Sequence, residues 1–223
     1  QSLIQNLIDL RWDYSIEENQ LSFFNASIEC EFLDLKKSNS TDSLNAATDF
    51  LSKNKGVLFT LPTSKDQIVF EEKNMAGHTE YFRKKYKNEN ISMVFSGPHF
   101  NCLLVTDHIA LKDVSSSITP KLIINKLNLA LSYFSNCKNV YFSGINPHCG
   151  ENGILGTEDS LISIAMKDLQ SKHPKINFQG PLSGDTVHNH FDKKSLLVYM
   201  SHDQGLAPFK MANGLLGANI SLG

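Results

Sequence analysis

The stretch "VYFSGINPHCGENGILGTEDSLISIAMKDL" (residues 140–169) decides the fold class of this chain. It begins with strand-forming residues, passes through an Asn-Pro-His turn and glycines at 150, 153 and 156, and ends in a helical segment near Thr157 onward. The helical segment is recognised by apolar residues that share one face, namely Leu161, Ile164, Ala165 and Leu169. A strand, a glycine-rich turn and a helix in this order form the repeating unit of a layered α/β protein.

Short apolar runs of the same kind recur along the chain, at residues 57–60, 91–95, 102–106 and 196–200. They are continuous rather than alternating, which is typical of strands covered on both faces. A second helix is predicted from Thr119, as N-cap, with Pro120 at its first position. A third runs to Leu51, with Ser43 or Asp42 as its cap, and residues 218–223 are expected to form a further strand.

The composition excludes several classes of protein. The 223 residues suffice for one large or two small domains, and 41% hydrophobic content is that of a globular chain. A formal charge of −2 without a cationic block argues against nucleic acid as a partner. No apolar run approaches the roughly 18 residues that span a bilayer, so no membrane partner is expected. Four cysteines without a C-x-x-C pair favour reduced thiols in a cytoplasmic protein.

Three histidines follow predicted strands directly. They are His108, His148 and His202. In a parallel sheet ligands bind at the carboxyl ends of the strands, so three imidazoles there predict a divalent metal site with open positions. The alternative is that each is a hydrogen-bonded loop histidine. Three nearby carboxylates are candidates to orient the imidazoles, namely Asp107, Asp185 and Asp203.

Other polar segments suit an anionic substrate. Gly77-His78-Thr79 offers an amide, an imidazole and a hydroxyl, and Lys210 offers a charge-assisted hydrogen bond. The glycine loop could hold an anion at a helix start, but Glu158 and Asp159 would oppose a phosphate there, unless they are simply favourable first-turn residues. No G-x-G-x-x-G follows a predicted strand, so a nicotinamide cofactor would be bound in another way.

Six ordered motifs carry a resemblance to a known family. They are "GHTEYF" (77–82), "TDHIALKDVSSSITP" (106–120), "GINPHCGENGILGTED" (144–159), "GPLSGDT" (180–186), "SHDQGLAPFK" (201–210) and "ANISLG" (218–223). In this order they resemble the 4-hydroxythreonine-4-phosphate dehydrogenases of vitamin B6 biosynthesis. The resemblance implies a two-lobed, three-layer α/β/α fold similar to isocitrate and isopropylmalate dehydrogenases, with residues 1–71 in the first lobe and 72–223 in the second.

The resemblance also implies a reaction. An NAD-dependent oxidoreductase of this kind oxidises 4-phosphooxy-L-threonine with decarboxylation to 3-amino-2-oxopropyl phosphate, on the way to pyridoxal phosphate. A divalent ion, Zn, Mg, Co or Mn, assists, and a cytoplasmic homodimer shares its active sites between subunits.

Residue roles are carried over from the family in the same way. His108 and His148 of one subunit and His202 of the other are the implied metal ligands. His78 and Thr79 are the implied substrate contacts, with Lys210 and Asn219 reaching the substrate from the partner subunit. The catalytic candidates are Asp185, Asp203 and Lys65. The residues that contact the cofactor stay unassigned.

The sequence departs from the family at both ends. A glycine-rich N-terminal turn of the "GEPAGIGPE" type is absent, as are an "HGTA" segment and an arginine beyond the last strand, and "TLPTSK" (60–65) replaces "TGPVHK". We therefore expect a piece of a longer chain. Alternative functions are a dehydrogenase of phosphorylated threonate or erythronate, and a binding module that has lost NAD binding. The metal and the choice between NAD and NADP stay open.

Overall fold

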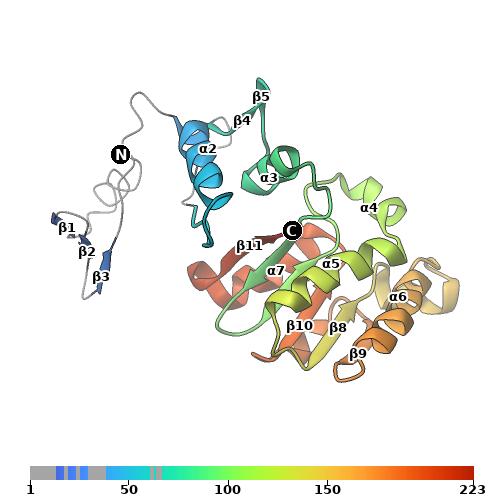
Figure 1. Ribbon diagram of the computed structural model, residues 1–223. Helices are drawn as coiled ribbons and strands as arrows, with labels where there is room; N and C mark the ends of the chain where they lie inside the picture. The colour runs from blue at the N-terminus through green and yellow to red at the C-terminus, as the bar shows by residue number, and fades with distance from the viewer. Residues whose placement is uncertain (1–13, 18–19, 24–25, 30–38, 61–62, 64–66) are drawn as a thin grey trace. The chain divides into compact units, whose positions relative to one another are not determined.

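The chain forms two compact units, Gln1–Tyr81 and Phe82–Gly223. The computed structural model describes residues 14–17, 20–23, 26–29, 39–60, 63 and 67–223 (Figure 1). The division between the units falls at Tyr81, whereas the sequence predicts a lobe boundary after residue 71, and that boundary stays a prediction for the whole protein.

The described part of the first unit contains short strands and one complete helix. Strands β1 (Tyr14–Glu17), β2 (Gln20–Phe23) and β3 (Ala26–Glu29) form an antiparallel sheet. Helix α2 (Ser40–Leu51) is followed by the hairpin of β4 (Val69–Phe70) and β5 (Lys73–Asn74). Helix α3 (His78–Tyr86) begins in this unit and ends in the second.

Helix α2 confirms one prediction and corrects another. The helix ends at Leu51 as expected, but its cap is Asn39 rather than Ser43 or Asp42. The Asn39 side chain accepts a hydrogen bond from the Asp42 amide at 2.9 Å, and the Asp42 carboxylate accepts one from the Asn39 amide at 3.1 Å. This reciprocal pair is a capping box, which places the acidic residue at the third helical position.

The strand predicted at residues 57–60 is wrong. This segment has no regular secondary structure, and Val57 and Phe59 are 87% and 88% exposed. Apolar content alone does not make a strand, because the backbone also needs a neighbouring strand to pair with. Among the described residues no strand pairs with this segment.

The second unit is built on a six-stranded mixed sheet among its described residues, in the order β11-β6-β7-β10-β8-β9. The strands are β6 (Ser92–Ser96), β7 (Asn101–Leu104), β8 (Asn139–Ser143), β9 (Asn177–Leu182), β10 (Ser195–Tyr199) and β11 (Ala218–Leu222). Strands β7, β10, β8 and β9 are mutually parallel, while β6 is antiparallel to both of its neighbours. The four parallel strands therefore end at the same edge of the sheet.

Five of these strands match predicted ones, and β9 was not predicted. Its sequence, Asn177 to Leu182, contains Gly180 and Pro181, which signal a turn more often than a strand. The helical elements of the unit are α4 (Leu111–Ser117), α5 (Pro120–Tyr133), η2 (Pro147–Gly153), α6 (Asp159–Lys172), η3 (Val187–His190), α7 (His202–Asn213) and η4 (Gly214–Leu216).

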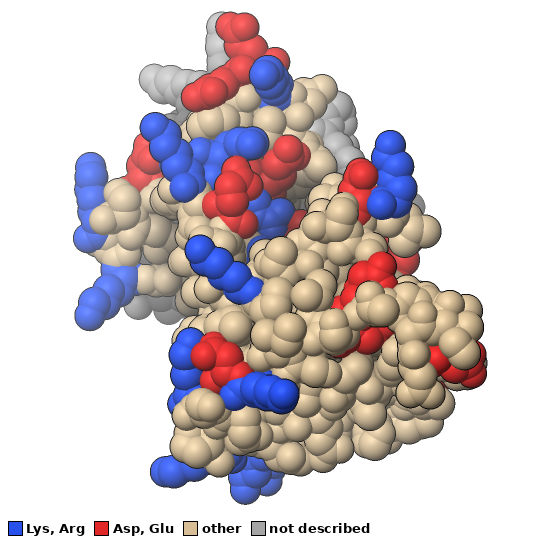
Figure 2. Space-filling view, turned by 90° about the vertical axis from the view of Figure 1, so that its right-hand side faces the viewer, with Lys and Arg blue, Asp and Glu red and all other residues tan. Residues whose placement is uncertain are grey.

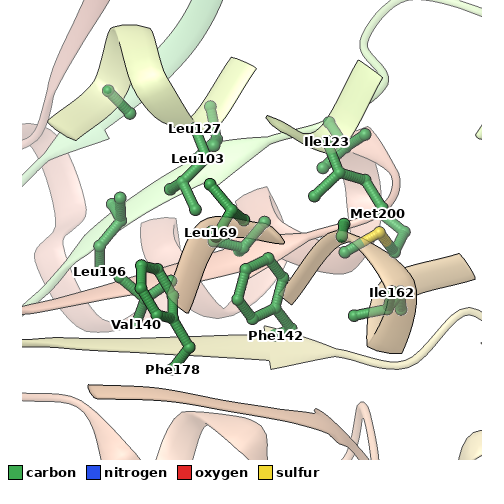
Figure 3. Close-up of a cluster of buried hydrophobic side chains, with 14 of the residues drawn as sticks. Leu103, Ile123, Leu127, Val140, Phe142, Ile162, Leu169, Phe178, Leu196 and Met200 are labelled. Carbon is green, nitrogen blue, oxygen red and sulfur yellow. The ribbon is translucent and has the colours of Figure 1, made fainter. Parts of the chain in front are cut away.

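Alternate residues of the strands fill two cores, one on each face of the sheet. Leu103, Leu196 and Val198 point to the face covered by α5 and α6. Phe142, Ile162 and Leu169 join Leu103 and Leu196 there (Figure 3). Cys102, Leu197 and Tyr199 point to the other face and pack against Leu206 and Phe209 of α7. Because both faces are covered, the unit is a three-layer α/β/α structure, and the predicted fold class is confirmed.

The two predicted helices of this unit are present. Thr119 caps α5 through a 3.1 Å bond from the Leu122 amide to its hydroxyl, with Pro120 in the first position. In α6 the buried residues include Ile162, Ala165 and Leu169, whereas Ile164 is 55% exposed. Of the four residues predicted to share the buried face, Ala165 and Leu169 are buried, whereas Leu161 is half-buried and Ile162 is buried instead of Ile164. Adjacent apolar residues leave the helical spacing ambiguous.

The surface carries charges of both signs. On the face in Figure 2, lysines and arginines are interspersed with aspartates and glutamates over the described residues. None of the described helices combines the length and the apolar content that crossing a membrane requires. The cytoplasmic location stays a prediction.

Candidate active site

The predicted site residues of the second unit lie in loops at one edge of its sheet. His108 follows β7, His148 follows β8, Asp185 follows β9 and His202 opens α7 directly after β10. Since these strands are parallel, their carboxyl ends deliver all four loops to the same edge. This is the edge at which α/β proteins bind ligands.

His108 and His202 lie close together within one chain. Their ring centroids are 5.2 Å apart, with 46° between the ring planes. The Nδ1 atom of His202 is 2.7 Å from a carboxylate oxygen of Asp203, which is itself 98% exposed. Asp203 thus has the contact expected of a carboxylate that fixes an imidazole tautomer and leaves Nε2 available.

His148 is exposed and sits in an unusual backbone segment. Residues 148–152 all have positive φ angles, between 46° and 80°. Gly150 is buried at the centre of this left-handed run, and a Cβ atom there would lie 2.3 Å from the carbonyl oxygen of Gly156. The glycine at 150 is therefore required both by its φ of 80° and by the close approach of the chain.

The acidic residues after the glycines hold this loop. Asp159 is buried, and its carboxylate accepts hydrogen bonds from the amides of Ile145 at 2.7 Å and Asn146 at 3.3 Å. The Asn146 side chain donates to Glu158 at 2.9 Å. Hydrogen bonds from the Glu158 backbone amide, Asn146 and Ser115 lower the pKa of Glu158. Both carboxylates accept hydrogen bonds from the turn before His148. This favours a structural role for them over one in repelling a phosphate from the loop.

Asp185 lies near two imidazoles. A hydrogen bond from Ser183 is the main cause that lowers the pKa of Asp185, and the charges of His148 and His188 act in the same direction. His188 lies in the short helical segment η3 and not in one of the loops that carry the three candidate ligands. Its neighbour His190 stacks on Tyr141 with ring centroids 4.7 Å apart, which is a packing contact.

Asp107 forms an ion pair with an arginine, and its predicted role in orienting an imidazole stays a prediction. It is buried, and both of its oxygens accept hydrogen bonds from Arg83, at 2.7 and 2.6 Å. Burial raises the pKa of Asp107, but the hydrogen bonds and charge of Arg83 outweigh it, so the net shift is downward. Arg83 also shares the Ile91 carbonyl with Lys126, at 2.8 and 2.5 Å. Nothing in the sequence indicates this group of side chains, because neither basic residue stands in a motif.

The implied substrate contacts belong to different units and are described separately. In the first unit His78 is half-buried, and burial lowers its pKa, while Thr79 is buried in the first turn of α3. In the second unit Lys210 of α7 and Asn219 of β11 are exposed. The catalytic candidate Lys65 lies outside the described residues.

A divalent ion fits the His108–His202 pair. A metal–nitrogen bond of about 2.1 Å puts each ligating ring centre roughly 3 Å from the ion, so two ligating rings lie up to about 6 Å apart. The observed 5.2 Å falls within this range. Within the described part of a single chain, however, no three His, Cys, Asp or Glu side chains are grouped closely enough to hold a metal. Within these described residues, His108 and His202 are the two candidate ligands that lie close together.

A pocket of about 170 Å³ lies elsewhere. It is lined by Asn101, Ser195, residues 133–137, Lys193 and Lys194, at the amino ends of β7 and β10. This is the edge opposite to the histidines, and the volume is smaller than the roughly 300 Å³ of a typical small-molecule site. The strand-end loops remain the candidate active site.

Comparison with known proteins identifies the relatives of this chain. The family model described as "Pyridoxal phosphate biosynthetic protein PdxA" matches residues 17–223. A 4-hydroxythreonine-4-phosphate dehydrogenase of Sulfurihydrogenibium sp. is 36% identical over 185 residues, which are 80% of this chain and 57% of the relative. The chain thus spans little more than half the length of this curated relative.

Solved structures agree with the fold. The crystal structure of a 4-hydroxythreonine-4-phosphate dehydrogenase from Burkholderia phymatum has 32% identity and a TM-score of 0.55, covering 66% of this chain and 47% of that one. A terephthalate 1,2-cis-dihydrodiol dehydrogenase from Burkholderia xenovorans LB400 has 22% identity and a TM-score of 0.59, covering 66% and 49%, and shares the fold alone. The sequence motifs, the three-layer sheet and the match over residues 17–223 lead to one conclusion: the chain belongs to the PdxA family of pyridoxal phosphate biosynthetic proteins.

Proposed function

We propose that this chain is the metal-binding portion of an NAD-dependent dehydrogenase that oxidises and decarboxylates 4-phosphooxy-L-threonine to 3-amino-2-oxopropyl phosphate. The observation that carries the proposal is the delivery of three imidazole-bearing loops to one sheet edge in a member of this family. The names of the 4-hydroxythreonine-4-phosphate dehydrogenase relatives support the substrate and the phosphate ester that it carries.

His108, His148 and His202 would hold the divalent ion, with Asp203 fixing the tautomer of His202. When bound, such an ion stabilises negative charge on a substrate oxygen. The lowered pKa of Asp185 makes its carboxylate a weaker base, so it suits the orientation of His148 better than the removal of a proton. Zinc is the ion that we favour for an imidazole site, with cobalt, manganese and magnesium as alternatives.

Substrate binding is assigned to residues whose side chains suit anions. His78 and Thr79 of one chain, with Lys210 and Asn219 of the other chain, would contact the phosphate and the carboxylate, and Lys210 contributes the positive charge. His78 fits as a neutral donor, because burial lowers its pKa. Lys65 is kept as a catalytic candidate on the strength of the family resemblance.

We propose that two copies of the chain complete each site. The absence of a third ligand beside the His108–His202 pair in the described residues of one chain supports this. Apolar side chains next to the histidines also support it, since Ile109 and Leu111 are 43% and 83% exposed and Ile154 and Leu155 are 79% and 45% exposed. Exposed apolar groups in such loops are typical of a protein interface. The resemblance assigns His202 to the partner, whereas an ion held by the His108–His202 pair of one chain would take His148 from the partner. Complementation between inactive variants distinguishes the two assignments.

The test is an assay of the full-length protein with 4-phosphooxy-L-threonine, NAD and a panel of divalent ions. The substitution His148→Ala is expected to abolish turnover and to weaken zinc binding, because a site with two imidazoles is incomplete. Unchanged turnover in this variant would refute the site. Activity on phosphorylated threonate or erythronate, but not on the amino acid, would replace the substrate and keep the mechanism.

A second candidate function is a binding module that retains the metal site without NAD. Its support is the departure from the family at "TLPTSK" (60–65), where the family usually has "TGPVHK". Calorimetry with NAD, in the presence of zinc and substrate, distinguishes the two functions. Heat of NAD binding supports the dehydrogenase, and its absence in the full-length protein supports the module.

A further inference from the structure

Two polar side chains link the bases of the loops that carry the three histidines. We propose that Gln204 and Thr106 are positioning residues, which fix His108, His148 and His202 relative to one another through a chain of hydrogen bonds. The inference rests on the proposed metal function and adds to it the residues that hold the ligands in place.

The Met200 peptide lies at the centre of this chain. Its carbonyl oxygen accepts hydrogen bonds from the Thr106 hydroxyl at 2.6 Å and from the Thr106 amide at 3.2 Å. Its amide donates to the Gln204 side-chain oxygen at 2.9 Å. The carbonyl and the amide of Met200, two residues before His202, are therefore both hydrogen-bonded.

Gln204 continues the chain to a second strand. Its side-chain nitrogen donates to the carbonyl oxygen of Gly144 at 2.8 Å, while the Gly144 amide donates to Leu182 at 2.7 Å. One amide side chain thus joins the ends of β10 and β8, and the backbone of Gly144 joins β8 to β9. The Gln204 nitrogen also lies beside Gly184, where an added Cβ atom would be only 3.2 Å away.

The linked peptides are near the imidazoles in sequence. His108 lies two residues after Thr106, His202 two residues after Met200, and His148 four residues after Gly144. The segment after Gly144 has little freedom of its own, because buried Asp159 holds the next two amides. A displacement at Gln204 would therefore be transmitted to the imidazoles instead of being absorbed by the intervening residues.

Gln204 is suited to this role because it uses both ends of its amide. The N-cap residue of α7, Ser201, makes no side-chain cap hydrogen bond, and Gln204 three residues later reaches back past it. A simple capping role would need only the oxygen of Gln204. The nitrogen is directed to a different loop, and this second bond is the observation that favours positioning over helix stabilisation.

The experiment is zinc titration calorimetry on the full chain and its Gln204→Met variant. Methionine keeps the volume and removes both hydrogen bonds. The matched control is Gln170→Met, because Gln170 donates a comparable 3.1 Å bond to the Ile176 carbonyl at the far end of α6. We expect the zinc Kd to rise about tenfold or more in Gln204→Met and to stay unchanged in Gln170→Met. The cobalt-substituted form should show an altered visible spectrum only in the former.

Two further variants make the outcome decisive. Gln204→Glu keeps the oxygen that accepts a hydrogen bond from the Met200 amide, but it replaces the nitrogen that donates to Gly144 with a carboxylate oxygen. The variant therefore keeps the capping bond and removes the bond on which positioning depends. A zinc Kd that stays at the wild-type value in both Gln204→Glu and Gln204→Met would overturn the positioning role and leave the proposed metal site intact. If Gln204→Met does not fold, Thr106→Val removes one side-chain bond, and it is expected to raise the Kd by a smaller factor, with an unchanged Kd again overturning the inference. Failure of the unmodified chain to bind zinc would instead refute the proposed metal site.

Discussion

Lys126 should destabilise the folded chain at neutral pH, and its replacement by methionine tests this. The side chain lies on α5, is only 3% exposed, and donates to the Ile91 carbonyl at 2.5 Å. Arg83 donates to the same carbonyl and already neutralises Asp107. Among the described residues no carboxylate forms an ion pair with this buried ammonium, and Lys126→Met would remove the charge while leaving the Arg83–Asp107 pair complete.

The size of the effect follows from the pKa. Burial is the main cause that lowers the pKa of Lys126 from 10.5 to about 8; the charge of Arg83 adds to it, and Asp107 and Glu89 oppose it. Since a tenfold change in proton affinity is about 1.4 kcal/mol, the ammonium costs the folded state roughly 3 kcal/mol below pH 8. Some of this gain is offset by the lost hydrogen bond, so the variant should be about 1–3 kcal/mol more stable at pH 7.

The pH dependence gives the sharper test. Between pH 8 and 10.5 the unfolded chain still binds the proton that the folded chain has released, so the lysine's penalty disappears as the pH rises. The stability advantage of Lys126→Met should therefore shrink over this range. Burial also raises the pKa values of Cys102 and Tyr199, which weakens the folded state at high pH, but this contribution is common to both proteins and cancels in their difference.

The assay is urea unfolding, followed by far-ultraviolet circular dichroism at pH 7 and at pH 9.5, for wild type and variant. Lys121→Met is the control, because Lys121 is an exposed residue on the same helix. It should change the free energy of unfolding by less than about 0.5 kcal/mol at both pH values. A Lys126→Met variant that is less stable at pH 7, or whose advantage does not change with pH, would refute the reasoning.

Three further predictions concern the histidine loops. Mixing inactive His108→Ala and His202→Ala proteins should restore about a quarter of the wild-type activity, because half of random pairs are mixed and each keeps one intact site; recovery from His108→Ala with His148→Ala instead would assign His148 to the partner. Zinc at 100 times its Kd should stabilise the chain by about 2.7 kcal/mol in thermal unfolding, and a chelator should reverse this; a midpoint that does not respond to either argues against the site. Gly150→Ala should cost about 2 kcal/mol or more and Gly153→Ala about 1 kcal/mol, since only the former meets a backbone oxygen; equal costs by urea unfolding would contradict the tight turn.

Much of the fold could be predicted because its signals are local. Thr119 and Pro120 specify a helix start by themselves, through a capping hydroxyl and a fixed φ angle. The continuous apolar runs of β6, β7, β8 and β10 are typical of strands that are buried on both faces of a sheet. The predictions were wrong where the secondary structure depends on pairing with a distant strand, or where the buried face of a helix had to be chosen. Residues 57–60 have strand composition but no described partner strand, and β9 has turn-forming residues but pairs with β8.

The candidate site was predictable in its positions but not in its contacts. Parallel strands bring their carboxyl ends together, so three histidines that follow strands had to lie at one edge. The sequence did not reveal that Asp107 would pair with Arg83, or that Asp159 would hold the turn before His148. Both depend on distances between residues that are 24 and 14 positions apart. Hydrogen-bond partners at such separations have no local signature.

The left-handed run at residues 148–152 has a consequence for chemical synthesis of the protein. Four of its five residues are not glycine, and each L-residue in that conformation costs roughly 1–2 kcal/mol. A D-amino acid has the mirror-image preference, so D-alanine introduced at position 149 or 151 by peptide ligation would occupy this backbone without that cost. The loop that presents His148 is thus a place where inverted chirality should strengthen the native structure.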